Sequence, residues 1–300
     1  MPPADTATGP LYGGIEAGGT RWVCAVGNGN GGLGARIVIP TTTPDETLDR
    51  AAEFFEANGS PGAVGVGCFG PVDVRPSSPT WGWITTTPKP GWANTDIAGP
   101  LGRRLRAAIA FDTDVNAAAL GEQLFGAAAG LDTFCYITVG TGIGAGIVAN
   151  GRLLHGLVHP EFGHMRVPHD VVRDPFPGAC PFHGDCLEGL ASGSSLRRRW
   201  SAPAEEIDDE ASWALVAGYL AAGIVNLICT LSPQRVVLGG GVLNQPLLMP
   251  LIRQQVRELL AGYLPGPAFS TEIDSYIVAP ACGAQAGVLG ALELARRASG

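Results

Sequence analysis

The feature that most constrains the fold of this chain is a pattern of hairpin, strand and helix that occurs twice, starting near residue 11 and near residue 133. In each copy a glycine-rich turn joins two apolar, strand-like runs: Glu16-Ala-Gly-Gly-Thr20 in the first and Thr138-Val-Gly-Thr-Gly-Ile-Gly144 in the second. Recurrence of one supersecondary unit predicts two similar α/β lobes with a cleft between them. We place these lobes at 1–117 and 118–300, with a terminal helix that can pack back on the first lobe.

Composition sets the class of the protein. The chain has 300 residues, of which 46% are hydrophobic and 15% charged, so it can bury a sizeable core. Its formal net charge of -8 argues against nucleic acid or an anionic membrane as a partner. Seven cysteines, an odd and sparse set, favour reduced thiols over a disulfide framework. Because residues 1–10 show no signal peptide, we expect a cytoplasmic protein.

One uncharged segment is long enough to span a bilayer. It runs from Trp213 to Leu231, follows an acidic stretch and contains Gly218, Gly223 and Asn226. It has no basic flanks, and a helix that is apolar all round can also lie at the centre of a soluble fold. We therefore expect a buried core helix here and no membrane partner.

Both glycine-rich turns have the chemistry of phosphate binding. Glycine lets the backbone approach a phosphate closely and direct N–H groups at it, and the turn threonines add hydroxyl donors. Neither turn is a Walker A loop, since no Gly-Lys-Ser/Thr follows, and neither opens a helix. The alternative is that both turns are ordinary glycine hairpins. Against it, a further strand also ends in three glycines, at 239–241. Together these features favour nucleotide binding.

A candidate catalytic base lies in Phe111-Asp112-Thr-Asp114-Val-Asn116, where a strand ends and an alanine-rich helix begins. Phosphoryl transfer to a hydroxyl needs alignment, charge neutralisation and a carboxylate that accepts the hydroxyl proton. The alternative is that Asp112 or Asp114 only caps the helix.

A metal site is indicated by Cys180-Pro-Phe-His183-Gly-Asp-Cys186. Two thiolates and two imidazoles would complete a closed tetrahedral zinc set, which leaves no open position for water and is therefore structural. The spacing leaves the fourth ligand open, and the alternative is a proline-rich loop with incidental cysteines. The candidate histidines for the fourth position are His155, His159, His164 and His169.

Two carboxylates, Glu161 and Glu188, flank this segment. Carboxylates are hard oxygen acceptors that suit sugar hydroxyl groups. The alternative for both is solvent-exposed charge or helix capping, because Glu188 can lie in the first turn of the next helix.

At these residues the chain resembles the ROK family of sugar kinases, and more closely its bacterial fructokinase branch, over nearly its whole length. The resemblance rests on stretches that start at Gly14, Thr87, Asp114 and Glu161, and above all on the zinc motif from Cys180 to Gly189. These stretches read Gly14-Ile-Glu-Ala-Gly-Gly-Thr20, Thr87-Pro-Lys-Pro-Gly-Trp-Ala-Asn-Thr-Asp96, Asp114-Val-Asn-Ala-Ala-Ala-Leu-Gly-Glu122, Glu161-Phe-Gly-His164 and Cys180-Pro-Phe-His-Gly-Asp-Cys-Leu-Glu-Gly189.

The resemblance implies the fold of the sugar kinase, actin and heat-shock ATPase superfamily, with two RNase H-like lobes that close over ATP and sugar. It implies that Asp114 is the catalytic base, that His164 is the fourth zinc ligand, and that the protein is a homodimer. The implied sugar-binding residues are Gly70, Thr113, Glu161, His164 and Glu188. The implied nucleotide-binding residues are Gly18, Gly19, Thr20, Thr141, Gly142, Gly240 and Gly241. The implied zinc ligands are His164, Cys180, His183 and Cys186.

Three positions depart from the pattern of the wider family. Glu16 stands where most members have the Asp that organises Mg²⁺ and phosphate, Thr113 replaces a sugar-contacting Asn, and Arg21 replaces a Lys. We therefore predict an ATP- and Mg²⁺-dependent hexose kinase, a fructokinase, that forms fructose 6-phosphate and holds a structural zinc ion. The alternatives are a kinase for mannose, glucose or N-acetylglucosamine, and a non-catalytic sugar sensor.

Overall fold

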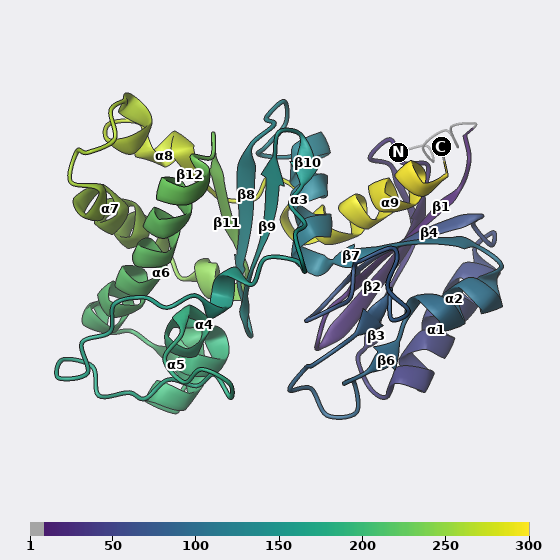
Figure 1. The fold of residues 1–300 in the computed structure, drawn as a ribbon, viewed down its shortest axis with the longest axis horizontal. Coiled ribbons are helices and arrows are strands. Elements are labelled where there is room, and N and C mark those ends of the chain that lie inside the picture. Colours follow the sequence, from purple (N-terminus) through teal and green to yellow (C-terminus); the bar gives the residue numbers. More distant parts are fainter. Residues whose placement is uncertain (1–8, 300) are drawn as a thin grey trace. The chain divides into compact units, whose positions relative to one another are not determined.

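The computed structural model describes residues 9–299 and contains two five-stranded sheets (Figure 1). The first sheet has the strand order β3-β2-β1-β4-β7 and the second β10-β9-β8-β11-β12, so the two sheets share one topology. In both sheets the first three strands of the chain form an antiparallel meander and the last two run parallel to the first of them. The recurring sequence pattern is therefore confirmed as a recurring sheet.

The strands of the two sheets have the following bounds. In the first sheet they are β1 (Tyr12–Ala17), β2 (Arg21–Gly27), β3 (Leu33–Pro40), β4 (Ala63–Cys68) and β7 (Ala108–Thr113), and in the second β8 (Phe134–Val139), β9 (Ile143–Ala149), β10 (Arg152–Leu153), β11 (Val236–Gly239) and β12 (Ile277–Val278). The segment between β4 and β7 contains β5 (Trp83–Ile84), which pairs with β6 (Thr95–Asp96).

The chain divides into two compact units whose bounds differ from the lobes that we predicted. Within residues 9–299, the first unit comprises everything up to Ala129, the short segment His155–His159 and everything from Cys282 onward. The predicted boundary at 117 falls inside α3 (Asp114–Phe125), which belongs to the first unit as a whole. The physical reason is that α3 packs along its length on the terminal helix α9 (Ala286–Ala298), itself part of this unit.

The first sheet is covered on both faces by helices (Figure 1). Successive residues of a strand point to opposite faces, and in β1 Gly13 faces Phe55 of α1 (Pro44–Ala57) whereas Gly14 faces Leu292 of α9. Small residues let α9 approach closely, since a Cβ on Gly65 of β4 would lie 1.8 Å from the carbonyl oxygen of Ala291. The helix α2 (Ala98–Leu105) packs beside α1.

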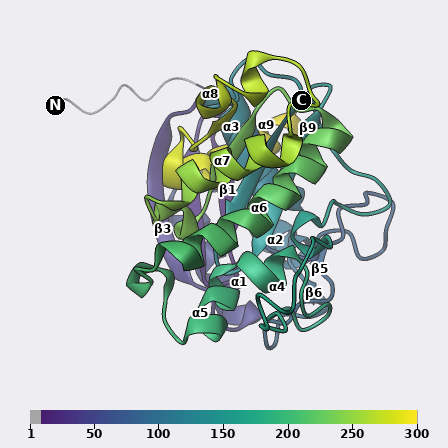
Figure 2. The same cartoon turned by 90° about the vertical axis from the view of Figure 1, so that its left-hand side faces the viewer.

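The second unit comprises Gly130–Leu154 and Pro160–Ala281. Its core is built around α6 (Glu210–Leu231), which packs against α7 (Leu248–Leu260), as Figure 2 shows. By length and composition α6 could cross a membrane, but half of its apolar window is buried within the protein. Its Trp213 is fully buried and donates its indole N–H to the carbonyl oxygen of Ile207. The prediction of a core helix therefore agrees with the packing of α6.

Two short helices follow each other in the second unit, α4 (Leu187–Ala191) and α5 (Gly193–Trp200). They are separate because the Ser192 hydroxyl accepts a hydrogen bond from the Ser195 N–H and caps the second of them. The remaining short helix of the second unit is α8 (Ile273–Tyr276).

Candidate functional site

In the first unit, three strands end at the same edge of the sheet. β1, β4 and β7 are parallel neighbours, and Ala17 pairs with Cys68, which pairs with Thr113. The segments that leave these strands therefore emerge side by side. This edge brings together the following predicted site residues: Gly18, Gly19, Thr20, Gly70, Thr113 and Asp114, with Glu16 next to the end of β1.

Asp114 is the first residue of α3 but does not cap it. The cap is Thr113, whose hydroxyl oxygen accepts a hydrogen bond from the N–H of Asn116 at 3.1 Å. Asp114 is half-buried, and its Oδ1 accepts the neighbouring N–H of Val115 at 2.8 Å. Burial raises the pKa of Asp114 to about 6. A carboxylate with a pKa near neutral suits a general base.

Asp112 is committed to structural contacts. This buried carboxylate accepts hydrogen bonds from the Asn116 side chain at 2.7 Å and the Thr113 N–H at 2.8 Å, and its Oδ2 lies 2.9 Å from His155 Nε2. The hydrogen bond to Asp112 raises the pKa of His155. Sequence reasoning missed this role for His155, because nothing in the spacing of the chain connects residues 112 and 155.

Glu16 lies at the same edge with one oxygen unsatisfied. Its Oε2 is buried and has no hydrogen-bond partner among residues 9–299. Burial, followed by the charge of Asp114, raises the pKa of Glu16 to about 7. Two neighbouring carboxylates with raised pKa values are the hard oxygen donors that a divalent cation such as Mg²⁺ prefers.

The first glycine-rich turn is fixed from outside. Thr41 donates its hydroxyl to the carbonyl oxygen of Gly18 at 2.8 Å and its N–H to that of Thr20 at 3.0 Å. Phe69 donates its N–H to the carbonyl oxygen of Ala17 at 2.8 Å. Backbone contacts to neighbouring segments thus hold the turn in place.

In the second unit, the corresponding edge carries the other glycines. β8 and β11 are parallel, and Thr138 pairs with Gly239, so the turn after β8 and the glycines after β11 are neighbours. Gly240 has a φ of 99°, and a Cβ there would lie 2.4 Å from the carbonyl oxygen of Val139. Only glycine fits this close approach of two backbones. The predicted residues at this edge are Thr141, Gly142, Gly240 and Gly241.

Glu188 braces the second turn. It lies in the first turn of α4, and its Oε2 accepts the N–H of Ile143 at 2.9 Å. A Cβ on Gly142 would come within 2.5 Å of that same oxygen, so glycine leaves room for the carboxylate. The start of α5 also contacts the turn, because Gly193 donates its N–H to the carbonyl oxygen of Gly140 at 2.7 Å.

The four predicted metal ligands converge on one point. The Nδ1 atom of His164 lies 3.6 Å from the sulfur atoms of Cys180 and Cys186 and 3.3 Å from Nδ1 of His183. Around tetrahedral Zn²⁺, with Zn–N of about 2.0–2.1 Å and Zn–S of about 2.3 Å, two nitrogens lie about 3.3 Å apart and a nitrogen and a sulfur about 3.6 Å apart. The donor set therefore fits zinc in both chemistry and spacing.

The loop that carries the metal ligands is tightly folded. Cys180 and Gly184 exchange backbone hydrogen bonds at 3.2 and 3.0 Å, and Gly184 adopts a φ of 64°. Cys186 caps α4, since its sulfur accepts the N–H of Gly189 at 3.4 Å. His164 ends a short 3-10 helix, Phe162–His164, and its N–H bonds the carbonyl oxygen of the exposed Glu161.

The other three histidines have partners elsewhere. His155 and His159 belong to the first unit, where His159 Nε2 accepts the N–H of Val72 at 3.1 Å. His169 belongs to the second unit but is buried in a polar network apart from the cluster. Of the four candidates for the remaining position, only His164 lies with Cys180, His183 and Cys186.

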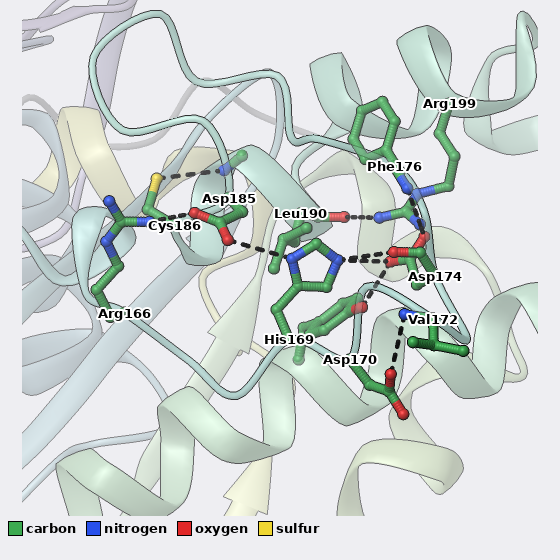
Figure 3. A network of polar contacts seen from close by, with 12 residues as sticks. Arg166, His169, Asp170, Val172, Asp174, Phe176, Asp185, Cys186, Leu190 and Arg199 are labelled. Carbon is green, nitrogen blue, oxygen red and sulfur yellow. Dashed lines mark hydrogen bonds and ion pairs between the residues drawn. The ribbon is translucent and has the colours of Figure 1, made fainter.

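Figure 3 shows the network that supports the metal-ligand loop. The ring of His169 bridges Asp185, at 3.2 Å from Nδ1, and the backbone oxygen of Asp174, at 3.0 Å from Nε2. Asp185 also pairs with Arg166, and Asp174 with Arg199. The hydrogen bond from His169 is the largest influence that lowers the pKa of Asp185. The loop is therefore fixed by charged contacts even apart from a metal.

Comparisons with known proteins give one consistent result. The profile of the ROK family matches residues 12–298. The fructokinase of Pediococcus pentosaceus is 41% identical over 96% of this chain and 98% of its own length, and that of Zymomonas mobilis is 42% identical over 95% and 96%. A ROK family glucokinase from Streptomyces griseus, solved in complex with glucose and AMPPNP, has a TM-score of 0.77 and 27% identity over 96% of this chain and 99% of that one.

These matches cover almost the whole of both chains and agree with the two sheets of identical strand order. The fold is that of the sugar kinase, actin and heat-shock ATPase superfamily. With a family profile matched from residue 12 to residue 298, the chain belongs to the ROK family, and within it to the fructokinase branch.

Proposed function

We propose that this protein is a fructokinase, which transfers the γ-phosphoryl group of ATP to the 6-hydroxyl of D-fructose and releases ADP and fructose 6-phosphate. Identity of 41–42% to two fructokinases over nearly full length supports fructose, against 27% to the glucokinase. We also propose that it acts in the cytoplasm and that it is a homodimer. Light scattering of the purified protein would test the oligomeric state.

The observation that carries this proposal is the placement of Asp114. It follows β7 at the edge where the phosphate turn also lies, it is not the helix cap, and its pKa is raised to about 6. We assign it to accept the proton of the sugar hydroxyl as the oxygen attacks phosphorus in line. Gly70 and Thr113 leave the same edge and are assigned to the sugar.

The phosphate groups of ATP are assigned to both glycine-rich turns, through backbone N–H groups and the hydroxyls of Thr20 and Thr141. Gly240 and Gly241 are assigned to the nucleotide next to the second turn. Glu16 and Asp114 would hold Mg²⁺, directly or through water, which neutralises charge on the transferring phosphoryl group. The unsatisfied Oε2 atom of Glu16 supports this assignment.

The zinc ligands and the sugar ligands share one loop. The Nδ1 atom of His164 faces the cluster, so its Nε2 atom is left for a sugar hydroxyl. Glu161 precedes it in the same 3-10 turn, and Glu188 follows Cys186 in α4. We assign zinc the structural task of fixing these three side chains. A closed set of two thiolates and two imidazoles has no position for a reacting water.

The test is ADP release from Mg-ATP with fructose, mannose, glucose and N-acetylglucosamine, for the wild type and Asp114→Asn. We expect the highest kcat/KM with fructose and loss of turnover in the variant. Preference for another hexose would change the substrate assigned to the sugar pocket, while the assignment as a kinase would stand. Binding of a sugar without turnover on any of them would favour a sensor and contradict the mechanism.

A further inference from the structure

The chain contains eighteen arginines and a single lysine, Lys89. Arginine and lysine differ in chemistry: guanidinium is a planar fork that suits fixed bidentate pairs, whereas ammonium is a compact point charge with three donors that can turn toward an incoming anion. Lys89 is therefore the one position among these nineteen at which the side chain carries an ammonium group and not a guanidinium group. The surroundings of Lys89 indicate what it binds.

Lys89 lies on a short, stiff loop between β5 and β6. The ends of the loop are joined, because Asn94 donates its N–H to the carbonyl oxygen of Thr85 at 2.9 Å. Proline on either side, Pro88 and Pro90, restricts the backbone at the lysine itself. Lys89 also accepts the N–H of Trp92 on its carbonyl oxygen at 3.2 Å. The backbone of Lys89 is therefore held by restraints on both sides.

The loop is attached to the first phosphate turn through Trp92. This side chain is fully buried, and its ring centroid lies 5.9 Å from that of Trp22 in β2 and 5.5 Å from that of Phe69. Its indole N–H donates to the carbonyl oxygen of Thr42 at 2.9 Å. Thr41, the preceding residue, makes the two hydrogen bonds to the turn described above, and Phe69 makes the third.

The ammonium group of Lys89 has no carboxylate partner among residues 9–299, and the side chain is half-buried. Two other cations of the same unit are paired: Arg75 bonds Asp73, and Arg104 bonds Glu56 and Asp49. A half-buried, unpaired cation on a stiff loop, attached to a turn with phosphate-binding chemistry, is suited to a phosphoryl group.

We propose that Lys89 is a phosphate-contacting residue of this site, which binds the oxygen atoms of the phosphoryl group as it passes from nucleotide to sugar and remains in contact with it in the phosphorylated product. The proposal rests on the proposed function in that it takes a kinase site for granted. Its ligand class is a phosphate ester or anhydride, and it excludes the unphosphorylated sugar as the partner of Lys89.

A single lysine allows a direct test. Reductive methylation with ¹³C-formaldehyde keeps the positive charge and gives one ε-dimethyl NMR signal, identified by its absence in Lys89→Arg. We expect this signal to shift on addition of MgADP, inorganic phosphate or fructose 6-phosphate and to stay in place with saturating fructose. A signal unmoved by all three phosphate compounds, while calorimetry shows that they bind, would overturn the proposal, as would an equal shift with fructose alone.

Kinetics provide an independent readout. For Lys89→Met we expect kcat/KM for MgATP to fall by about 10- to 100-fold, with KM for fructose changed less than about twofold. Lys89→Arg should retain more than about a tenth of the activity, because it keeps a cation. The matched control is Arg103→Met, which removes one exposed charge from α2 in the same unit and should change neither constant. A Lys89→Met enzyme with unchanged constants would contradict the proposal.

The two proposals fail in different ways. If the wild type shows no turnover on fructose, the substrate assignment fails, but the NMR experiments with MgADP and inorganic phosphate still decide the role of Lys89. If fructose is phosphorylated at a normal rate by Lys89→Met, the fructokinase stands and the assignment of Lys89 falls.

Discussion

The two sheets have the same strand order, and each carries a glycine-rich turn at one edge. The two edges differ in how their carboxylates are hydrogen-bonded. At the edge of the first sheet, Glu16 keeps a buried oxygen without a partner and Asp114 has a pKa raised to about 6. At the edge of the second, Glu188 accepts an N–H from the turn. The loop that leads to Glu188 carries four converging metal ligands, and charged pairs support it.

The difference suggests a division of labour between copies of one topology. Carboxylates with an unsatisfied oxygen or a raised pKa lower stability, and their presence indicates a use in chemistry. The carboxylate that braces the second turn and the converging metal ligands contribute to the shape of their loop as well. We therefore expect substitutions in the first unit to change the reaction more than stability, and substitutions in the second to change stability first.

The largest effect should come from Asp114→Asn. We expect kcat to fall by about 10³-fold, since the variant cannot accept a proton. Because burial raises the folded-state pKa of Asp114, the wild type loses stability as pH rises from about 4 to about 6. At pH 8 the free energy of unfolding of the variant should therefore exceed that of the wild type by about 1–2 kcal/mol.

Steady-state kinetics and urea unfolding measure both quantities. Glu188→Gln is the contrasting variant, because its carboxylate has a hydrogen bond to lose, and it should be less stable than the wild type. An Asp114→Asn protein that is less stable than the wild type would contradict the division drawn here.

Next in size is loss of the metal. Cys186→Ser removes one thiolate ligand but keeps a side chain that can cap α4, and we expect the free energy of unfolding to fall by about 3 kcal/mol or more, with zinc content reduced and KM for fructose raised. Elemental analysis and thermal unfolding check this. Cys229→Ser, at an exposed position in α6, is the control and should leave all three unchanged. Full loss of zinc with unaltered affinity for the sugar would contradict the proposal that zinc fixes the sugar-binding side chains.

Gly240→Ala should cost about 3 kcal/mol of unfolding free energy, because the new Cβ meets the backbone of Val139 and the residue has a φ of 99°. The matched variant is Gly241→Ala, where a Cβ meets nothing within 4 Å, and its stability should stay within about 0.5 kcal/mol of the wild type. Chemical denaturation of the pair decides the matter. Equal stabilities would mean that the two backbones do not approach as closely as described.

The smallest predicted effect is on pH dependence. With a pKa raised to about 6, Asp114 is ionised above that pH and protonated below it, so kcat/KM should fall on the acid side, about tenfold at pH 5. Profiles of wild type and Asp114→Asn should differ, because the residual rate of the variant lacks this limb. An acid limb centred near pH 4 would show that burial does not perturb the base.

Local elements were largely predictable from the sequence, and the division into units was not. The glycine-rich turns were predicted to join strand-like runs, and they join β1 to β2 and β8 to β9. The sequence left open whether the terminal helix packs on the first lobe, where α9 covers β1 and β4, and nothing local signals that His155–His159 returns to the first unit. Such contacts depend on packing between segments distant in sequence.

The candidate site shows the same limit. Spacing identified the cluster of Cys180, His183 and Cys186 but left the fourth ligand open; the family resemblance pointed to His164, and the fold brings His164 to the other three. Likewise, the sequence left Asp112 and Asp114 open as cap or base. The structure gives the cap to Thr113 and engages Asp112 with His155, which leaves Asp114 as the candidate base.

The position of α9 has a consequence for how the protein is made. The first unit begins at the start of the chain, but the helix that covers one face of its sheet is synthesised after the whole of the second unit. On the ribosome, β1 and β4 must therefore wait with an apolar face uncovered while the later unit can already fold. Chaperones that bind exposed apolar strands should therefore contact β1 and β4 of the nascent chain before α9 is made.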